Sequence, residues 1–283
     1  MKGTEVKRTT IDPRYYFDLN IKLMALCGLR CSMTKTIGSF INKVPTLMAN
    51  LVGIAVFVSE FNLLVDAVHL RDSALAAQTL GQLVSNTQCI TKGLLFAFSI
   101  EKLQPVFHEI RILWEKYQPE EEIQKSIVKD ADRTLTFCKC YVTANFSCLV
   151  SFSLPMAVKL FLQYQSRVAT NHTYDVSQTM LLVKYPFEIT DTSTFAIVIF
   201  LEEFLLVMNV VFWVSSDTTF AQTTTHLCLQ FKVLKRDIEK MFNYEGPDGK
   251  EILLQLVERH RELLRYRDNP KRVFLKTIIT MFF

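Results

Sequence analysis

The sequence of 283 residues is strongly apolar: 49% of its residues are hydrophobic and 22 are Phe, whereas Gly and Pro number only eight each. Because Gly and Pro together make up about 12% of an average protein, this composition excludes a disordered, collagen-like or turn-rich all-β chain. The net charge of +4 gives no reason to expect a nucleic-acid partner. Seven scattered cysteines do not form a disulfide scaffold. We therefore expect a helix-rich membrane protein.

Four long apolar stretches divide the chain, and each reaches the roughly 20 residues that a helix needs to cross a bilayer. In chain order they cover residues 44–64, 74–100, 135–162 and 195–214. The second is the weakest because it contains Gln, Asn and Lys side chains. The sequence thus predicts an all-α, multi-span transmembrane helical bundle over residues 44–214. A soluble bundle is the alternative, but soluble helices are rarely apolar around their whole circumference.

Lysine and arginine are distributed unevenly between these stretches. Residues 1–43, 101–134 and 215–272 carry eight, six and eleven of them, whereas residues 65–73 and 163–190 carry one and two. The cytoplasmic connections of membrane proteins are rich in Lys and Arg. This pattern therefore predicts a cytoplasmic N-terminal segment and an extracellular connection between the third and fourth spans.

Asn171 begins an Asn-His-Thr triplet, which is a glycosylation acceptor, in the connection expected outside the cell. We therefore predict that Asn171 is glycosylated. Cys27 and Cys31 are spaced as a pair of metal ligands can be, but no second pair or nearby His completes a site, so we expect free thiols. No nucleotide-binding, metalloprotease or hydrolase motif is present in the sequence. We expect no enzyme, no catalytic residue, no metal and no cofactor.

Polar side chains within the expected spans predict a small-molecule site in the outer half of the bundle. Several of them recur on one face of the second stretch. Polar amides in a bilayer face a cavity or another helix rather than lipid. The candidate ligand-binding residues are Gln78, Gln82, Asn86, Ser151, Phe152, Phe195, Ile199 and Glu202. Together they predict a largely apolar pocket with a few polar anchors, and interhelical packing is the alternative for each of them.

Glu202 and Glu203 are adjacent carboxylates at membrane depth, where burial of a charge is costly. Neighbouring residues on a helix point about 100° apart, so both cannot face one site equally. We expect that one carboxylate lines a cavity while the other pairs with a basic group.

Helical periodicity continues beyond the fourth stretch, from Leu227 to Met241. A loop with Gly and Pro at residues 243–249 interrupts it. Residues 251–268 then carry apolar side chains on one side. The sequence predicts that residues 215–268 form a cytoplasmic helical extension, with amphipathic helices that pack against a cytoplasmic layer or another subunit.

The segment after residue 214 resembles the insect odorant receptor family. The most specific part is Asp217-Thr218-Thr219-Phe220, then His226-Leu227 and Gln230-Phe231-x-x-Leu234, which are similar to the pattern that follows the family's fourth transmembrane helix. The helix that contains His260 and Leu263-Leu264, and the Tyr185-Pro186-Phe187 sequence before the fourth stretch, are also similar. The resemblance covers about residues 10–268.

This resemblance implies an odorant-gated cation channel subunit of the plasma membrane. Such a subunit binds volatile small molecules, lies in the lipid bilayer and forms a hetero-tetramer with the family's shared co-receptor. The resemblance also implies an odorant pocket in the outer halves of helices two to six. The alternatives are a gustatory-type chemoreceptor and a four-span transporter or membrane enzyme.

The family has seven membrane helices, and the seventh lines its ion path. In this sequence the apolar tail at residues 273–283 is too short to cross a bilayer. We therefore expect residues 269–283 to be the start of a missing fifth span or an aberrant C-terminus, in a truncated receptor.

Overall fold

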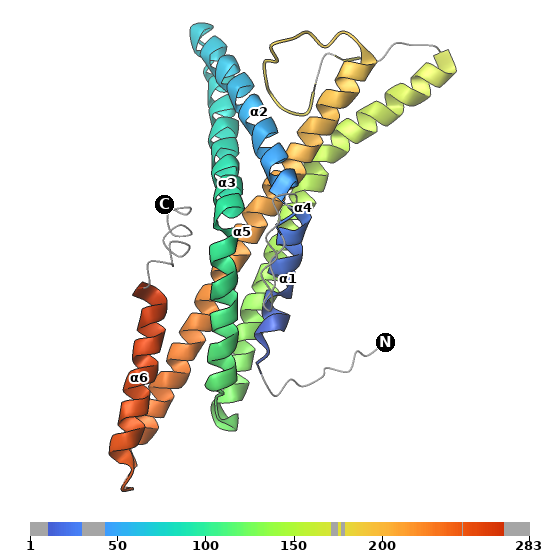
Figure 1. Ribbon diagram of the computed structural model, residues 1–283. Coiled ribbons are helices and arrows are strands. Elements are labelled where there is room, and N and C mark those ends of the chain that lie inside the picture. Colours follow the sequence, from blue (N-terminus) through green and yellow to red (C-terminus); the bar gives the residue numbers. More distant parts are fainter. Residues whose placement is uncertain (1–10, 30–42, 171–174, 177–178, 245, 269–283) are drawn as a thin grey trace.

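The computed structural model describes residues 11–29, 43–170, 175–176, 179–244 and 246–268. In these residues the chain forms six α-helices and no strand (Figure 1). The helices are α1 (Pro13–Leu26), α2 (Val44–His69), α3 (Ser73–Lys116), α4 (Glu121–Thr170), α5 (Thr192–Phe242) and α6 (Gly249–Asp268). The predicted all-α fold is confirmed.

Helix α1 begins at a capped N-terminus and lies against α5 (Figure 1). The Asp12 carboxylate accepts a hydrogen bond from the backbone N–H of Arg14 at 2.9 Å, and Pro13 occupies the first turn. Phe17 is fully buried on the inner face. On the same face the Asn20 amide donates to the Thr218 hydroxyl at 2.8 Å. An apolar face and a buried hydrogen bond therefore join α1 to α5.

Helices α2 and α3 form a hairpin with a tight turn. The Asp72 side chain caps α3 by accepting from the backbone N–H of Leu75 at 3.0 Å, and Arg71 takes a left-handed φ of 58°. The two helices approach closely at Gly93, where a Cβ atom would lie 2.7 Å from the Asn50 side-chain amide. A larger residue at this position would have to displace the Asn50 amide and the Phe212 ring, which both lie within 3 Å of that Cβ position.

Helices α4 and α5 are much longer than the apolar stretches that they contain. They have 50 and 51 residues, so each extends about 75 Å, whereas the apolar core of a bilayer is about 30 Å thick. The apolar residues 135–162 and 195–214 occupy only parts of them. The segment 101–134, expected as a connection, is largely helical because α3 runs to Lys116 and α4 begins at Glu121.

Within the described residues, α2, α4 and α5 are the three helices long and apolar enough to cross a membrane. The second expected span, residues 74–100, lies in α3, whose polar side chains keep it below this level of hydropathy. Helix α4 exposes large apolar side chains such as Phe152, Leu154 and Phe161, which are 50 to 59% accessible. So much exposed apolar surface is typical of contact with lipid rather than water. The molecule is a helical membrane bundle.

A charged cluster joins three of the long helices near residue 214. The Lys92 ammonium of α3 lies 2.9 Å from one carboxylate oxygen of Asp217 in α5 and 3.8 Å from the ring centroid of Trp213. The Tyr141 hydroxyl of α4 donates to the other oxygen of Asp217 at 2.6 Å. One carboxylate thus holds α3, α4 and α5 together.

Beyond residue 214, α5 buries an aromatic-lined histidine. His226 is inaccessible to solvent, and its ring centroid lies 5.1, 5.3 and 5.9 Å from those of Tyr16, Phe17 and Trp114. Burial lowers the pKa of His226 from its ordinary value of 6.5 to about 3. The ring is therefore neutral at pH 7 and packs as an aromatic side chain where α1, α3 and α5 meet.

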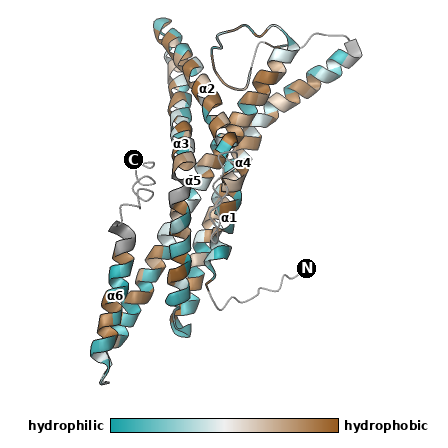
Figure 2. Cartoon of the chain, viewed as in Figure 1, coloured by the Kyte–Doolittle hydropathy of each residue, from teal (hydrophilic) through white to brown (hydrophobic). Residues whose placement is uncertain are grey.

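Helix α6 folds back along the end of α5 (Figure 1). Leu256 and Leu263 are buried against Leu234 of α5. The Arg259 guanidinium donates to the Asp237 carboxylate at 2.6 Å and to the Gln230 side chain at 3.2 Å. Figure 2 shows polar and apolar residues alternating along α6, whereas α2 is mostly apolar. This is the amphipathic helix that the sequence predicted at residues 251–268.

Candidate functional site

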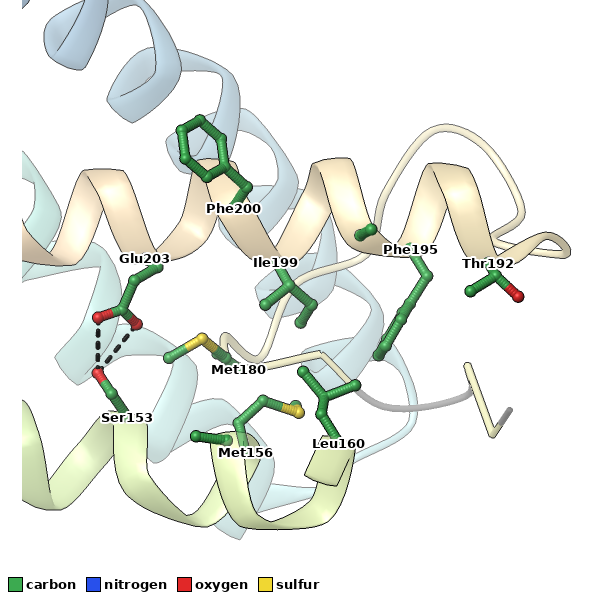
Figure 3. A pocket seen from close by; sticks show the side chains of 11 residues that line it. Ser153, Met156, Leu160, Met180, Thr192, Phe195, Ile199, Phe200 and Glu203 are labelled. Carbon is green, nitrogen blue, oxygen red and sulfur yellow. Dashed lines mark hydrogen bonds between the residues drawn. The ribbon is translucent and has the colours of Figure 1, made fainter. Parts of the chain in front are cut away.

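A cavity of about 570 Å³, here called the first cavity, opens between α4 and α5 close to the start of α5. Figure 1 shows the two helices diverging at this end. The cavity is lined by Ser153, Met156, Ala157, Leu160, Met180, Thr192, Phe195, Ala196, Ile199, Phe200 and Glu203 (Figure 3). Small-molecule sites in proteins commonly have volumes of about 300–1,000 Å³. The first cavity therefore has the size of such a site.

Helical periodicity brings the lining residues together. On α4, Ser153, Met156 and Leu160 are separated by three and four positions, which places them on one face. On α5, Phe195 and Ile199 are four positions apart, and the Phe195 side chain is almost fully buried. The connection between the helices adds Met180. An apolar chamber results from two helix faces and one loop.

Glu203 and Ser153 form the polar end of the first cavity (Figure 3). The Ser153 hydroxyl lies 3.0 and 2.9 Å from the two carboxylate oxygens of Glu203, toward which it donates. Across the part of the chain that the structure describes, no basic side chain is paired with Glu203. Thr192 lies at the opposite end of the cavity (Figure 3).

A second cavity of about 430 Å³ lies on another side of α5, between that helix, α2 and the segment Tyr185–Phe187. Glu202 lines it and is almost fully buried. Its carboxylate accepts hydrogen bonds from the Tyr185 hydroxyl at 2.5 Å and from the backbone N–H of Met180 at 2.8 Å. Burial, assisted by the Glu202 carboxylate, raises the pKa of Tyr185, so this hydroxyl keeps the proton that it donates.

The two adjacent carboxylates therefore face different cavities, as their angular separation on α5 requires. The sequence led us to expect that one of them pairs with a basic group. In the described residues each one instead accepts a hydrogen bond from a hydroxyl group, Glu202 from Tyr185 and Glu203 from Ser153. The connection between α4 and α5 supplies the first hydroxyl, and α4 supplies the second.

The structure does not gather the eight candidate ligand-binding residues into one pocket. Phe195 and Ile199 line the first cavity, and Glu202 lines the second. Asn86 is buried between α2 and α3, where its amide donates to the Gly53 carbonyl at 3.1 Å and to the Glu60 carboxylate at 3.2 Å. These contacts match the interhelical packing alternative for Asn86.

The remaining candidates are not among the residues that line either cavity. Gln82 is half-buried on α3, and its side-chain carbonyl is buried without a hydrogen-bond partner among the described residues. Gln78, Ser151 and Phe152 are exposed, and the Ser151 hydroxyl donates back to the Ser147 carbonyl of its own helix. Ligand binding by these side chains stays a prediction.

Several lining residues were not among the candidates from the sequence: Ser153, Ala157, Leu160, Met180, Thr192, Ala196, Phe200 and Glu203. For α4 a signal was available, because Ser153 and Leu160 share a helical face with Met156, whereas Ser151 points to the opposite side of the helix. For Met180 the sequence offers no such signal, since nothing in it predicts how the connection between α4 and α5 folds.

Some expected features fall outside the described residues. Asn171, Cys31 and residues 269–283 are among them, so the structure tests neither the glycosylation, nor the cysteine pair, nor the apolar tail. Elsewhere in the chain, the described His, Cys, Asp and Glu side chains form no cluster of three that could hold a metal ion.

Comparison with known proteins gives a family. A family model described as seven-transmembrane odorant receptor matches residues 73–283, which include α3 to α6 and both α-helical walls of the first cavity. No curated protein is similar enough to be matched with the chain. The matched family is described as one of odorant receptors. Because the match covers well over half of its residues, the chain belongs to the insect odorant receptor family.

Proposed function

We propose that this chain is a subunit of an odorant-gated cation channel, and that it binds a small volatile molecule in the first cavity. The observation that carries the proposal is the cavity itself, a largely apolar chamber between two membrane helices with a carboxylate at one end. Family membership supports a chemoreceptor role. A volatile molecule is small and largely apolar, so burial against Phe195, Ile199, Met156 and Leu160 provides its binding free energy.

The distribution of basic residues supports the orientation that odorant detection needs. Residues 163–190, a range that contributes Met180 to the first cavity, carry two Lys or Arg, whereas residues 215–272 carry eleven. With a cytoplasmic N-terminus, the cavity lies in the outer half of the membrane. We therefore propose a multi-pass protein of the plasma membrane whose ligand enters from the extracellular side.

A cation pathway requires partners in this proposal. Family resemblance assigns the ion path to a seventh helix and the assembly to a hetero-tetramer with a shared co-receptor. The cytoplasmic packing of α5 against α6, through Leu234, Leu256 and Leu263, supports a compact layer below the membrane on which such subunits can meet. Odorant-evoked current is therefore expected only when the co-receptor is present.

The test is electrical recording from cells that express the receptor with the co-receptor during exposure to a panel of volatile compounds. The key variant is Ala157→Phe, because Ala157 lines the cavity and is exposed, so a larger side chain fills space without removing a buried contact. We expect the half-maximal odorant concentration to rise at least about tenfold, which corresponds to about 1.4 kcal/mol.

Ala144→Phe is the matched control, since Ala144 is an exposed alanine of α4 that does not line the first cavity. It should leave the dose–response curve unchanged. An unaltered curve for Ala157→Phe would remove the first cavity from the proposal. Absence of current for every compound, with receptor present at the cell surface, would contradict the channel function. Current without the co-receptor would favour a gustatory-type receptor.

A further inference from the structure

The first cavity carries a carboxylate at one end. Among the described residues that line it, Ser153, Thr192 and Glu203 carry polar side-chain groups other than thioether sulfur, and Glu203 carries the one ionisable group. Figure 3 places Thr192 at one end and the Ser153–Glu203 pair at the other, with apolar side chains between them. Eleven positions on α5 separate Thr192 from Glu203, which is about 16 Å along the helix axis. A ligand in this chamber therefore meets a carboxylate at one end of a long apolar wall.

The Glu203 carboxylate has unused capacity to accept hydrogen bonds. An ionised carboxylate offers about four lone-pair sites, whereas a serine hydroxyl has a single hydrogen to donate. Ser153 lies nearly equally far from both oxygens, at 3.0 and 2.9 Å, so its one hydrogen is shared between them. The remaining sites of an incompletely buried carboxylate are open to a ligand.

Other described side chains do not satisfy these sites. The nearest lysine along α4 beyond Ser153 is Lys159, and its ammonium is paired with the Asp175 carboxylate at 3.0 Å. The neighbouring carboxylate Glu202 differs, because Tyr185 and Met180 both donate to it. Of the two carboxylates, only Glu203 combines a place in the first cavity with a single protein donor.

We propose that the first cavity selects ligands with a hydrogen-bond donor at one end of an apolar body, and that Glu203 accepts this hydrogen bond. The head group is a hydroxyl or an ammonium, since both present hydrogen to a carboxylate. This inference rests on the proposed function of the same cavity. Acceptor-only ethers and esters turn oxygen lone pairs toward the carboxylate and leave it unsatisfied, which costs binding free energy.

The test measures equilibrium binding to the purified receptor in lipid nanodiscs, with three probes that share one hexyl chain: 1-hexanol, hexylamine and 1-methoxyhexane. Hydrogen bonds to a charged group are stronger than neutral ones. We expect 1-hexanol or hexylamine to bind at least about tenfold more tightly than the ether. Tighter binding of 1-hexanol identifies a neutral donor as the preferred head group, and tighter binding of hexylamine identifies a cationic one. Equal affinity for all three overturns the proposal without any variant.

Glu203→Gln assigns the selectivity to the residue. The amide presents N–H groups as well as a carbonyl oxygen, so we expect the ether to bind nearly as well as the alcohol and the amine. Ser153→Ala removes the competing donor and should keep or enlarge the preference. Glu188→Gln makes the same change on an exposed carboxylate outside the cavity and should alter nothing. A preference that persists in Glu203→Gln overturns the role of Glu203.

Binding and recording separate this inference from the proposed function. Donor-selective binding without any evoked current would contradict the channel proposal and leave the selectivity standing. Conversely, ether- or ester-evoked current that Ala157→Phe weakens as strongly as any alcohol response would support the cavity and overturn the selectivity.

Discussion

Lys92 is a cation whose side chain is only 4% accessible, within a stretch that is expected to cross the membrane. A buried charge that loses its partner is left uncompensated in a medium that solvates it poorly. Lys92 has one carboxylate partner in the cluster, Asp217, which also accepts from Tyr141. The stability of the helix bundle near residue 214 should therefore depend on Asp217.

We predict that Asp217→Asn lowers the stability of the detergent-solubilised protein by about 3 kcal/mol or more, because it removes the carboxylate charge that lies 2.9 Å from the buried Lys92 ammonium. The double variant Lys92→Met with Asp217→Asn should recover most of this loss, since an intact buried pair has a small net value. The stability of the single and the double variant is measured by heating each protein and using size-exclusion chromatography to quantify what remains folded. Asp66→Asn, which breaks the exposed pair with Lys184, is the control and should cost less than about 1 kcal/mol. Equal melting temperatures for Asp217→Asn and Asp66→Asn would refute the prediction.

Individual site residues were predictable from the sequence only where depth and residue type were sufficient. Phe195 and Ile199 were found because apolar residues near the start of the fourth stretch lie at the depth of the cavity. Glu203 was passed over in favour of Glu202, although the two are adjacent. The reason is physical: about 100° separates them on the helix, and the rotation of α5 relative to α4 and α2 comes from tertiary packing.

At the scale of helices, periodicity predicted more than it did for single residues. The helix beyond residue 214 and the amphipathic segment at residues 251–268 correspond to the second half of α5 and to α6. The lengths of α3 and α4 were underestimated, because hydropathy marks where a helix is apolar and not where it ends. Helix α4 continues through polar residues from Glu121, where hydropathy gives no helical signal.

The contact between α5 and α6 makes a prediction for one leucine. Leu263 is fully buried against α5, and Leu263→Ala should weaken the docking of α6 by about 2–5 kcal/mol through lost burial and a residual cavity. Weaker docking should increase local opening of α6, so the sensitive measurement is the rate of tryptic cleavage within α6. Leu254→Ala is the matched control, since this side chain is 61% exposed. Identical cleavage rates for the two variants would show that α6 is not held by this contact.

For the whole molecule, the number of membrane crossings depends on α3. Hydropathy selects α2, α4 and α5, while α3 carries the polar residues that pack against α2. The hairpin turn at Arg71–Asp72 and the close approach at Gly93 pair α3 with α2, so polar groups such as Asn86 are satisfied by α2 instead of facing lipid. A hydropathy threshold is applied to each helix separately, so it does not take the contacts between α2 and α3 into account.

Glycosylation of Asn171 distinguishes four crossings from three. With a cytoplasmic N-terminus, crossings by α2, α3 and α4 place residue 171 outside the cell, whereas without a crossing by α3 the same residue lies inside. We predict that deglycosidase treatment changes the gel mobility of the protein and that Asn171→Gln abolishes this change. Asn145→Gln is the control, because Asn145 also begins an acceptor triplet but lies within α4, where its amide donates to the Tyr141 carbonyl at 2.9 Å. It should leave the mobility change intact. A wild-type protein without any mobility change, in cells that glycosylate a co-expressed membrane protein, would count against α3 as a span.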